Sequence, residues 1–274
     1  MILSTFLRFI AAINNSIRLT IWNSFYKESN IISLEILKDT YVKFYAYGDI
    51  VRIFYSQQAI VKHKKSFEYD TLEKYINFLT PDSIVLDIGA NIGLYSLLGS
   101  KFLTGKGTIY AIEPTTKTYS FLKKNISLND IKNVIPFKLA FSNKKSLVSM
   151  TPPQKALNNN FQDSFNQIQS VTGLENKSDI IETSLLDDFI NEQNISKVDL
   201  IKIDVEGAEL LCFQGGLQLL NSDNKPMIIF ECDENHCKSF GYRVVEVLLL
   251  LEKYGYDCIQ SEYGQWIATP KNRC

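Results

Sequence analysis

The part of this chain that most constrains its fold runs from residue 84 to residue 96 and reads I-V-L-D-I-G-A-N-I-G-L-Y-S. A short β-branched run ends in Asp87, a turn with two glycines follows, and an apolar segment of helical length, 92–98, comes next. This order predicts a strand, a tight turn and a helix. In an open α/β sheet such turns lie at the carboxyl ends of the strands, where ligands bind. Because Gly89 and Gly93 lack a Cβ atom, we expect a ligand to approach the backbone closely here.

A second predicted strand has a spacing that suits a ribose-containing ligand. Residues 108–112 read T-I-Y-A-I and are followed by Glu113, twenty residues beyond Gly93. An acidic side chain at that offset is placed to accept hydrogen bonds from ribose hydroxyls. The turn lacks the middle glycine of the dinucleotide fingerprint, and the carboxylate of Asp87 would repel a pyrophosphate. S-adenosylmethionine offers a ribose to Glu113 and a cationic end to Asp87; a turn that binds no ligand is the simpler alternative.

Strand and helix patterns alternate along the chain from residue 67 onward. Strands are expected at 84–88, 108–112, 134–139, 198–204 and 226–231, and a helix is expected at 69–79. This alternation predicts an α/β fold with a mostly parallel sheet and helices on both faces. Two further short segments, 256–260 and 265–268, predict an antiparallel hairpin at the edge of that sheet.

The first 66 residues differ from the rest and predict a small extension. Residues 1–13 are apolar enough for a helix, but they are too short to span a bilayer and lack the features of a signal peptide. The alternating segments 40–46 and 50–55 predict a β-hairpin. We therefore divide the chain into an N-terminal helix and hairpin, 1–66, and a catalytic domain, 67–274.

An insertion rich in Asn, Gln and Ser separates the third and fourth expected strands, at residues 151–178. Long loops in compact domains are usually either functional or disordered. We expect a lid on the substrate side, anchored by Phe161 and Phe165. A plain surface loop is the alternative.

Charge and cysteine content limit the partners and the compartment. The chain has 29 Lys and Arg against 30 Asp and Glu, a balance that argues against a nucleic-acid partner. Its five cysteines are odd in number and include no C-x-x-C pair. Reduced thiols in a cytoplasmic protein therefore fit better than a disulfide framework.

A second group of polar residues lies in residues 198–209, which read V-D-L-I-K-I-D-V-E-G-A-E. Asp204 and Glu206 are expected at the carboxyl end of the fourth strand, beside the first site. A carboxylate that follows an apolar strand needs a partner, and Lys202 is the candidate. For Glu206 and Glu209, stabilisation of a helix N-terminus is the alternative explanation.

A third group follows the fifth strand and contains Glu231 and His236. Histidine titrates in the range that is useful for acid–base catalysis, although a lone loop histidine is more often only solvated. The catalytic candidates are therefore Asp204, Glu206 and His236. An alternative is that Asp204 and Glu231 hold a divalent ion. Two carboxylates are too few to define such a site, so no metal ligand is assigned.

Several motifs together resemble those of the FkbM-type S-adenosylmethionine-dependent methyltransferases. They are V-L-D-I-G-A-N-I-G-L-Y-S, Y-A-I-E-P, L-A-F-S, S-L-L-D-D-F-I and D-L-I-K-I-D-V-E-G-A-E-L, and the resemblance runs from about Phe67 to Gln260. It implies a Rossmann-like, seven-stranded methyltransferase fold, S-adenosyl-L-methionine as cofactor and, commonly, O-methylation of sugars or other small molecules. The cofactor-binding residues that it implies are Glu68, Asp87, Gly89, Asn91, Gly93, Glu113 and Ala140.

The expected function is thus methylation of a hydroxyl on a sugar, a glycan or a glycosylated small molecule. We expect neither a nucleic-acid acceptor nor a transmembrane segment. One alternative is an NAD-dependent oxidoreductase, against which the missing glycine and Asp87 both count. Another is a non-catalytic domain of the same fold that binds a partner through residues 1–66. The sequence does not specify the acceptor hydroxyl or the oligomeric state.

Overall fold

The computed structural model describes residues 31–37, 40–47, 50–55, 69–150, 179–261 and 265–271. Its main sheet has seven strands: β4 (Ile84–Ile88), β5 (Thr108–Ile112), β6 (Val134–Phe137), β10 (Leu200–Ile203), β11 (Met227–Glu231), β12 (Tyr256–Gln260) and β13 (Gln265–Pro270). They are ordered β12-β13-β11-β10-β4-β5-β6. Strand β13 runs antiparallel to β11 and β12, and the other pairings are parallel. The predicted fold class, with its C-terminal antiparallel hairpin, is confirmed.

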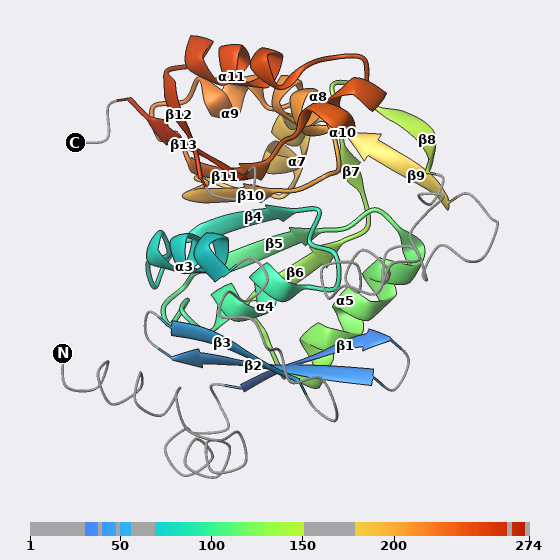
Figure 1. Ribbon diagram of the computed structural model, residues 1–274, viewed down its shortest axis with the longest axis vertical. Coiled ribbons are helices and arrows are strands. Elements are labelled where there is room, and N and C mark those ends of the chain that lie inside the picture. The colour runs from blue at the N-terminus through green and yellow to red at the C-terminus, as the bar shows by residue number, and fades with distance from the viewer. Residues whose placement is uncertain are drawn as a thin grey trace.

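Helices cover both faces of this sheet (Figure 1). On one face lie α3 (Tyr69–Asn77), α4 (Leu94–Ser100) and α5 (Thr116–Leu128); on the other lie α7 (Leu186–Glu192), α8 (Glu209–Gln214), α9 (Leu217–Leu220), α10 (Glu234–Ser239) and α11 (Val244–Lys253). Successive strand residues point to opposite faces, so Val85 joins the core cluster beneath α4 while Leu86 joins the cluster beneath α8. Strands buried on both faces read as continuous apolar runs, which is why the sequence predicted them well.

A small second sheet was not predicted. It has the order β7-β9-β8 and consists of β7 (Ala140–Phe141), β8 (Ser146–Met150) and β9 (Asp179–Ser184). The expected third strand, 134–139, ends at Phe137, and the chain then changes sheets to pair with β9. Only Lys138 and Leu139 separate the two strands, so the sequence reads as one longer strand. The predicted lid, 151–178, lies outside the described residues and stays a prediction.

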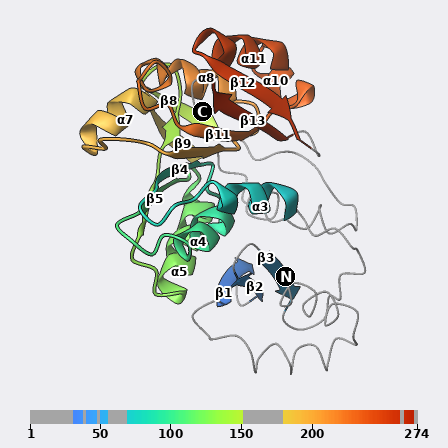
Figure 2. The same ribbon diagram turned by 90° about the vertical axis from the view of Figure 1, so that its left-hand side faces the viewer.

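The N-terminal extension contains three strands where a hairpin was expected. Strands β1 (Ile31–Leu37), β2 (Thr40–Tyr47) and β3 (Ile50–Tyr55) form one antiparallel sheet. The first strand was missed although Ile32, Leu34 and Ile36 alternate with polar residues at the period of a strand. This sheet lies against the layer of α3, α4 and α5 (Figure 2), and the fully buried Ile32 belongs to the same core cluster as residues of α4.

Two other expectations concern the chain's ends and the membrane. The predicted helix at 1–13 and the boundary between residues 66 and 67 lie outside the described residues. Within the described ranges, no helix is both long enough and apolar enough to cross a bilayer.

Candidate functional site

The strand order has its switch point between the carboxyl ends of β4 and β10. From β4 the chain moves outward through β5 to β6, and it then returns to the other side of β4 as β10 and β11. Ligands of open α/β sheets bind at such a reversal. The two strand ends are joined there, because the backbone amide of Asp204 donates to the carbonyl of Ile88 at 3.0 Å. The first two polar groups predicted from the sequence therefore meet at one edge of the sheet.

The glycine turn after β4 is shaped by the protein's own atoms. Gly89 has a φ of +79° and Gly93 a φ of +101°, values that favour glycine. A Cβ atom on Gly89 would lie 1.9 Å from the carbonyl oxygen of Asp204, and one on Gly93 would lie 2.5 Å from Cδ1 of Leu97. The protein's own backbone and core atoms therefore fill the Cβ direction of both glycines, and the approach of a ligand to this backbone stays a prediction.

Asp87 is buried at the end of β4, with 1 % of its surface exposed. Its Oδ2 atom accepts a hydrogen bond from Oγ of Ser96 at 2.5 Å, whereas Oδ1 has no hydrogen-bond partner among the described residues. Burial raises the pKa of Asp87, and the positive charge of Lys202 opposes that rise. Ser96 was missed as a site residue, although it closes the same sequence motif nine positions later.

Lys202 is the partner of Asp204, as predicted. Its Nζ lies 2.9 Å from Oδ2 of Asp204 and 4.7 Å from the centroid of the Tyr95 ring. Lys202 is paired in register with Asp87 on the neighbouring strand and is almost fully buried. Removing a buried ammonium from water is costly unless it is paired, so the two carboxylates and the ring hold this charge inside the domain.

Glu113 is fixed by the turns around it. Oε2 accepts from the backbone amide of Asn91 at 3.1 Å, and Oε1 accepts from the amide and hydroxyl of Thr115 at 2.9 and 2.5 Å. Burial raises the pKa of Glu113, and these hydrogen bonds counteract the rise. Asn91 adopts a φ of +52° and its Oδ1 atom is buried with no partner in the described structure. Glu113 thus ties the second strand end to the glycine turn of the first.

Glu206 and His236 come together from different strand ends. Nε2 of His236 lies 3.2 Å from Oε2 of Glu206, and its Nδ1 lies 2.8 Å from Oδ2 of Asp233. The pKa of Glu206 is raised by burial and then by the negative charge of Asp204, while His236 opposes the rise. Asp233 was not chosen from the sequence. The sequence does hold a signal for Asp233, because an aspartate three positions before His236 is suited to cap a helix. In the structure its Oδ1 atom caps α10.

Three further predicted residues are less central. Glu231 ends β11 and accepts a hydrogen bond from Nε2 of Gln265 at 2.6 Å. Ala140 begins β7, which pairs with β9 in the small sheet. Glu68 lies outside the described residues. The alternative that Glu231 and Asp204 together hold a metal ion stays a prediction.

A pocket of about 300 Å³ lies between α7 and α9. Its lining includes Asn191, Lys197 and Gln218, and residues 222–224. These belong to the segments that precede β10 and β11, so the pocket opens at the amino ends of those strands. The candidate site lies at the opposite, carboxyl ends, and the pocket is therefore separate from it.

The chain matches the methyltransferase FkbM domain over residues 87–258, well over half its length. It therefore belongs to the FkbM family of S-adenosylmethionine-dependent methyltransferases. The match includes Asp87, Glu113 and the whole of the 198–209 segment. Family membership favours a methyltransferase over the NAD-dependent oxidoreductase that the sheet alone would allow.

Curated relatives are similar at modest identity. The chain is 30% identical to Methyltransferase 1 of Beauveria bassiana over 49% of this chain and 58% of that protein. It is 27% identical to the hexuronic acid methyltransferase AglP of Haloferax volcanii over 57% and 59%, and 26% identical to the 2-O-methyltransferase NoeI of Sinorhizobium fredii over 51% and 60%. The chain thus spans less than two thirds of the length of each of these relatives.

Proposed function

We propose that this chain transfers the methyl group of S-adenosylmethionine to a hydroxyl of a sugar, a glycan or a glycosylated small molecule. Membership of a methyltransferase family supports the transfer. Two of the relatives are named for a hexuronic acid and for 2-O-methylation, and these names support a sugar hydroxyl as the acceptor. The near-neutral charge supports a small or glycan acceptor over nucleic acid.

The switch point has the chemistry that the cofactor needs. Buried polar atoms are almost always hydrogen-bonded, yet Oδ1 of Asp87 and Oδ1 of Asn91 have no partner among the described residues. We propose that these two acceptors hold the ammonium end of the cofactor and that Glu113 accepts from its ribose hydroxyls. This pair of orphaned oxygens at the switch point is the observation that carries the proposal. Gly89 and Gly93 support the site by shaping the turn, and Ala140 is proposed to lie near the adenine.

The bound cofactor supplies an electrophilic methyl group, and this chain's residues prepare the hydroxyl that attacks it. Orienting the two reactants supplies much of the rate, because effective molarities of well-aligned groups reach about 10⁵ M or more. A sugar hydroxyl is weakly acidic, so a base that takes its proton contributes about 10²-fold or more.

His236 and Glu206 are the proposed base. Nδ1 of the ring is held by Asp233, which orients Nε2 toward Glu206. Because the pKa of Glu206 is raised, the pair can share one proton between Nε2 and the carboxylate. A pair holding one proton can take a second from the acceptor hydroxyl. Asp204 is a second candidate, although Lys202 already occupies one of its oxygens.

The test is a binding and turnover experiment on the full chain. Titration calorimetry should detect binding of S-adenosylmethionine and of its demethylated product, and no binding of NAD. Labelled cofactor incubated with a panel of uronic acids, neutral sugars and glycolipids should then label an acceptor as a methyl ether. Binding of NAD alone would refute the proposal. Cofactor binding without transfer to any acceptor would favour the non-catalytic domain.

A further inference from the structure

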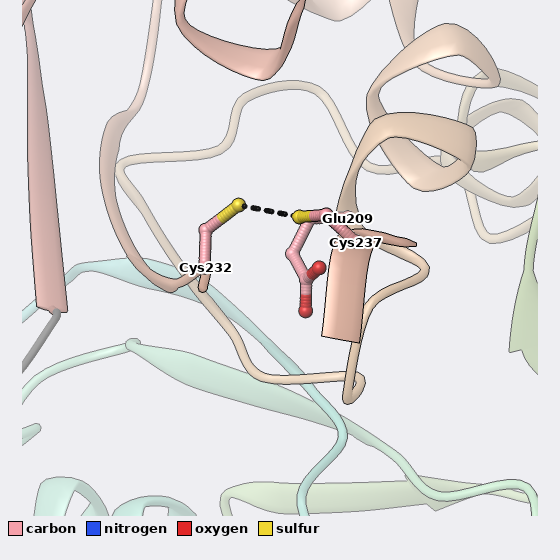
Figure 3. A group of neighbouring side chains, drawn as sticks. All are labelled: Glu209, Cys232 and Cys237. Carbon is pink, nitrogen blue, oxygen red and sulfur yellow. Dashed lines mark hydrogen bonds between the residues drawn. The ribbon is translucent and has the colours of Figure 1, made fainter. Parts of the chain in front are cut away.

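Behind the candidate base lies a buried group of metal-ligating side chains. Glu209 begins α8, Cys232 directly follows β11, and Cys237 lies in α10, and Figure 3 shows the three side chains converging. One ligand atom from each lies within 4.8 Å of the other two. The sulfur atoms of Cys232 and Cys237 are 3.3 Å apart, and all three residues are at most 4 % exposed. Elsewhere among the described residues, no group of three such side chains comes together.

Glu209 is the unusual member of the group. Its Oε1 atom accepts hydrogen bonds from the backbone amides of Val205 and Gly207 at 3.2 and 3.3 Å. Its Oε2 atom is buried and has no hydrogen-bond partner among the described residues. An orphaned carboxylate oxygen in the interior is costly, since burial removes its hydration and nothing replaces it. A cation between this oxygen and the two sulfur atoms would supply the missing interaction.

We propose that Glu209, Cys232 and Cys237 form a binding site for one divalent zinc ion. Zinc accepts thiolate sulfur at about 2.3 Å and carboxylate oxygen at about 2.0–2.2 Å. Two thiolate sulfur atoms on a tetrahedral zinc are consequently about 3.8 Å apart, so the two sulfur atoms here, at 3.3 Å, would move apart by roughly half an ångström on binding the ion. Three protein ligands leave the fourth position to a water molecule.

Metal binding at this site is linked to protons. Without a metal, burial raises the pKa of both thiols, which therefore keep their protons at neutral pH, and it also raises the pKa of Glu209. Zinc would displace the two thiol protons to solvent, together with any proton held by Glu209. Its apparent affinity should therefore rise with pH.

The position of the group gives the ion a structural role. It would hold two segments together and take no part in methyl transfer. Glu209 follows Glu206 by three residues, across the turn that precedes α8, and Cys237 adjoins His236 in α10. The two turns already touch, because a Cβ on Gly207 would lie 2.6 Å from the carbonyl oxygen of His236. A zinc ion would link these segments and so fix the distance between His236 and Glu206.

The competing chemistry at this place is a disulfide. The sulfur atoms are close enough to bond if a peroxide removes two electrons and two protons from the thiols and is itself reduced to water and an alcohol. The raised thiol pKa values make such oxidation slow, because the thiolate is the reactive form. A disulfide would also leave Oε2 of Glu209 without a partner.

The experiment uses the full chain, reduced and freed of metal with a chelator, and titrated with Cd²⁺ and then with Zn²⁺. We expect one Cd²⁺ per chain to give the near-ultraviolet absorption of cadmium–thiolate bonds, and Zn²⁺ to displace it and raise the Tm. The variants Cys232→Ser, Cys237→Ser and Glu209→Gln should each weaken binding by more than the roughly 10–100-fold that a lost supporting hydrogen bond costs. None of these readouts requires methyl transfer, so failure here is distinct from failure of the proposed function.

The controls are Cys212→Ser and Cys258→Ser. Cys212 is a buried thiol that contacts the carbonyl oxygen of Phe141, and Cys258 is partly exposed on β12. Both should bind Cd²⁺ as the parent chain does. Three results would overturn the proposal. They are no cadmium–thiolate absorption in the parent chain, absorption that Cys232→Ser and Cys237→Ser both retain, and unchanged metal affinity in Glu209→Gln. If Cys232 and Cys237 reacted with a thiol reagent in the unfolded chain only after a reductant had been added, they would instead form a disulfide.

Discussion

Nε2 of His236 lies 3.2 Å from Oε2 of Glu206. This titratable pair joins α10, which follows β11, to the turn that follows β10. Burial raises the pKa of Glu206 above its ordinary value, which favours the protonated form of its carboxyl. The imidazole can then act as the base only when the pair holds fewer than two protons. Proton-dependent chemistry at this edge of the sheet is therefore a property of the pair and not of either residue alone.

The first prediction concerns the pH profile of this pair. Turnover should rise with pH as the pair loses its second proton. His236→Gln should lower kcat by about 10²-fold or more and leave cofactor affinity unchanged. In Glu206→Gln the carboxyl can no longer release the second proton of the pair, so the rising limb of kcat/KM should move to higher pH. A limb that stays in place in Glu206→Gln would show that the two groups are not coupled.

The second prediction concerns the cofactor. Glu113→Gln keeps an oxygen for Thr115 but removes the charge that is proposed to accept from the ribose. The affinity for S-adenosylmethionine should fall by about 1–3 kcal/mol, the scale for hydrogen bonds to a charged group. Calorimetry measures this directly. Glu182→Gln is the matched control, since Glu182 is exposed on β9 and should bind the cofactor as the parent chain does. Equal affinities in both variants would exclude Glu113 from the site.

The third prediction separates two costs of replacing glycine. Gly89→Ala and Gly241→Ala both place a side chain at positive φ, at +79° and +82°. A Cβ on Gly241 meets nothing within 4 Å, so that variant should lose only the roughly 1–2 kcal/mol of left-handed backbone. Gly89→Ala should lose clearly more, because its Cβ collides with the carbonyl oxygen of Asp204. Urea unfolding followed by circular dichroism gives both values; equal losses would contradict the packing argument.

The fourth prediction concerns the ion pair of Lys202 and Asp204. Asp204→Asn removes the charge that faces a buried ammonium, so the free energy of unfolding should fall by about 1–3 kcal/mol. The lower half of that range is expected, because the side chain of Asp204 is 24% exposed and solvent screens it. Turnover per folded molecule should change only a few-fold. A loss of about 10²-fold at unchanged stability would instead identify Asp204 as the base.

The parallel sheet was predictable because its strands are short apolar runs with clear ends. Asp87, Glu113 and Asp204 could be placed at one edge for the same reason, since the carboxyl ends of parallel strands share an edge. The small sheet was not predicted, because Ala140 and Phe141 follow β6 so closely, after Lys138 and Leu139, that the sequence reads as one strand.

Contacts between distant segments were the harder part. A carboxylate after an apolar strand needs a partner, which suggested Lys202 for Asp204, and the structure confirms the pair. The pairing of His236 with Glu206 depends on how two turns pack, and nothing in either segment specifies it. Glu209 likewise meets Cys232 and Cys237 only through the fold, since their spacing matches no metal motif.

The contact between Gly89 and Asp204 has a consequence for anyone who redesigns this protein. The segments 84–93 and 200–209 interlock through backbone atoms, so a chimaera that exchanges one of them inherits a steric mismatch unless its partner comes too. They are best transplanted as a single cassette.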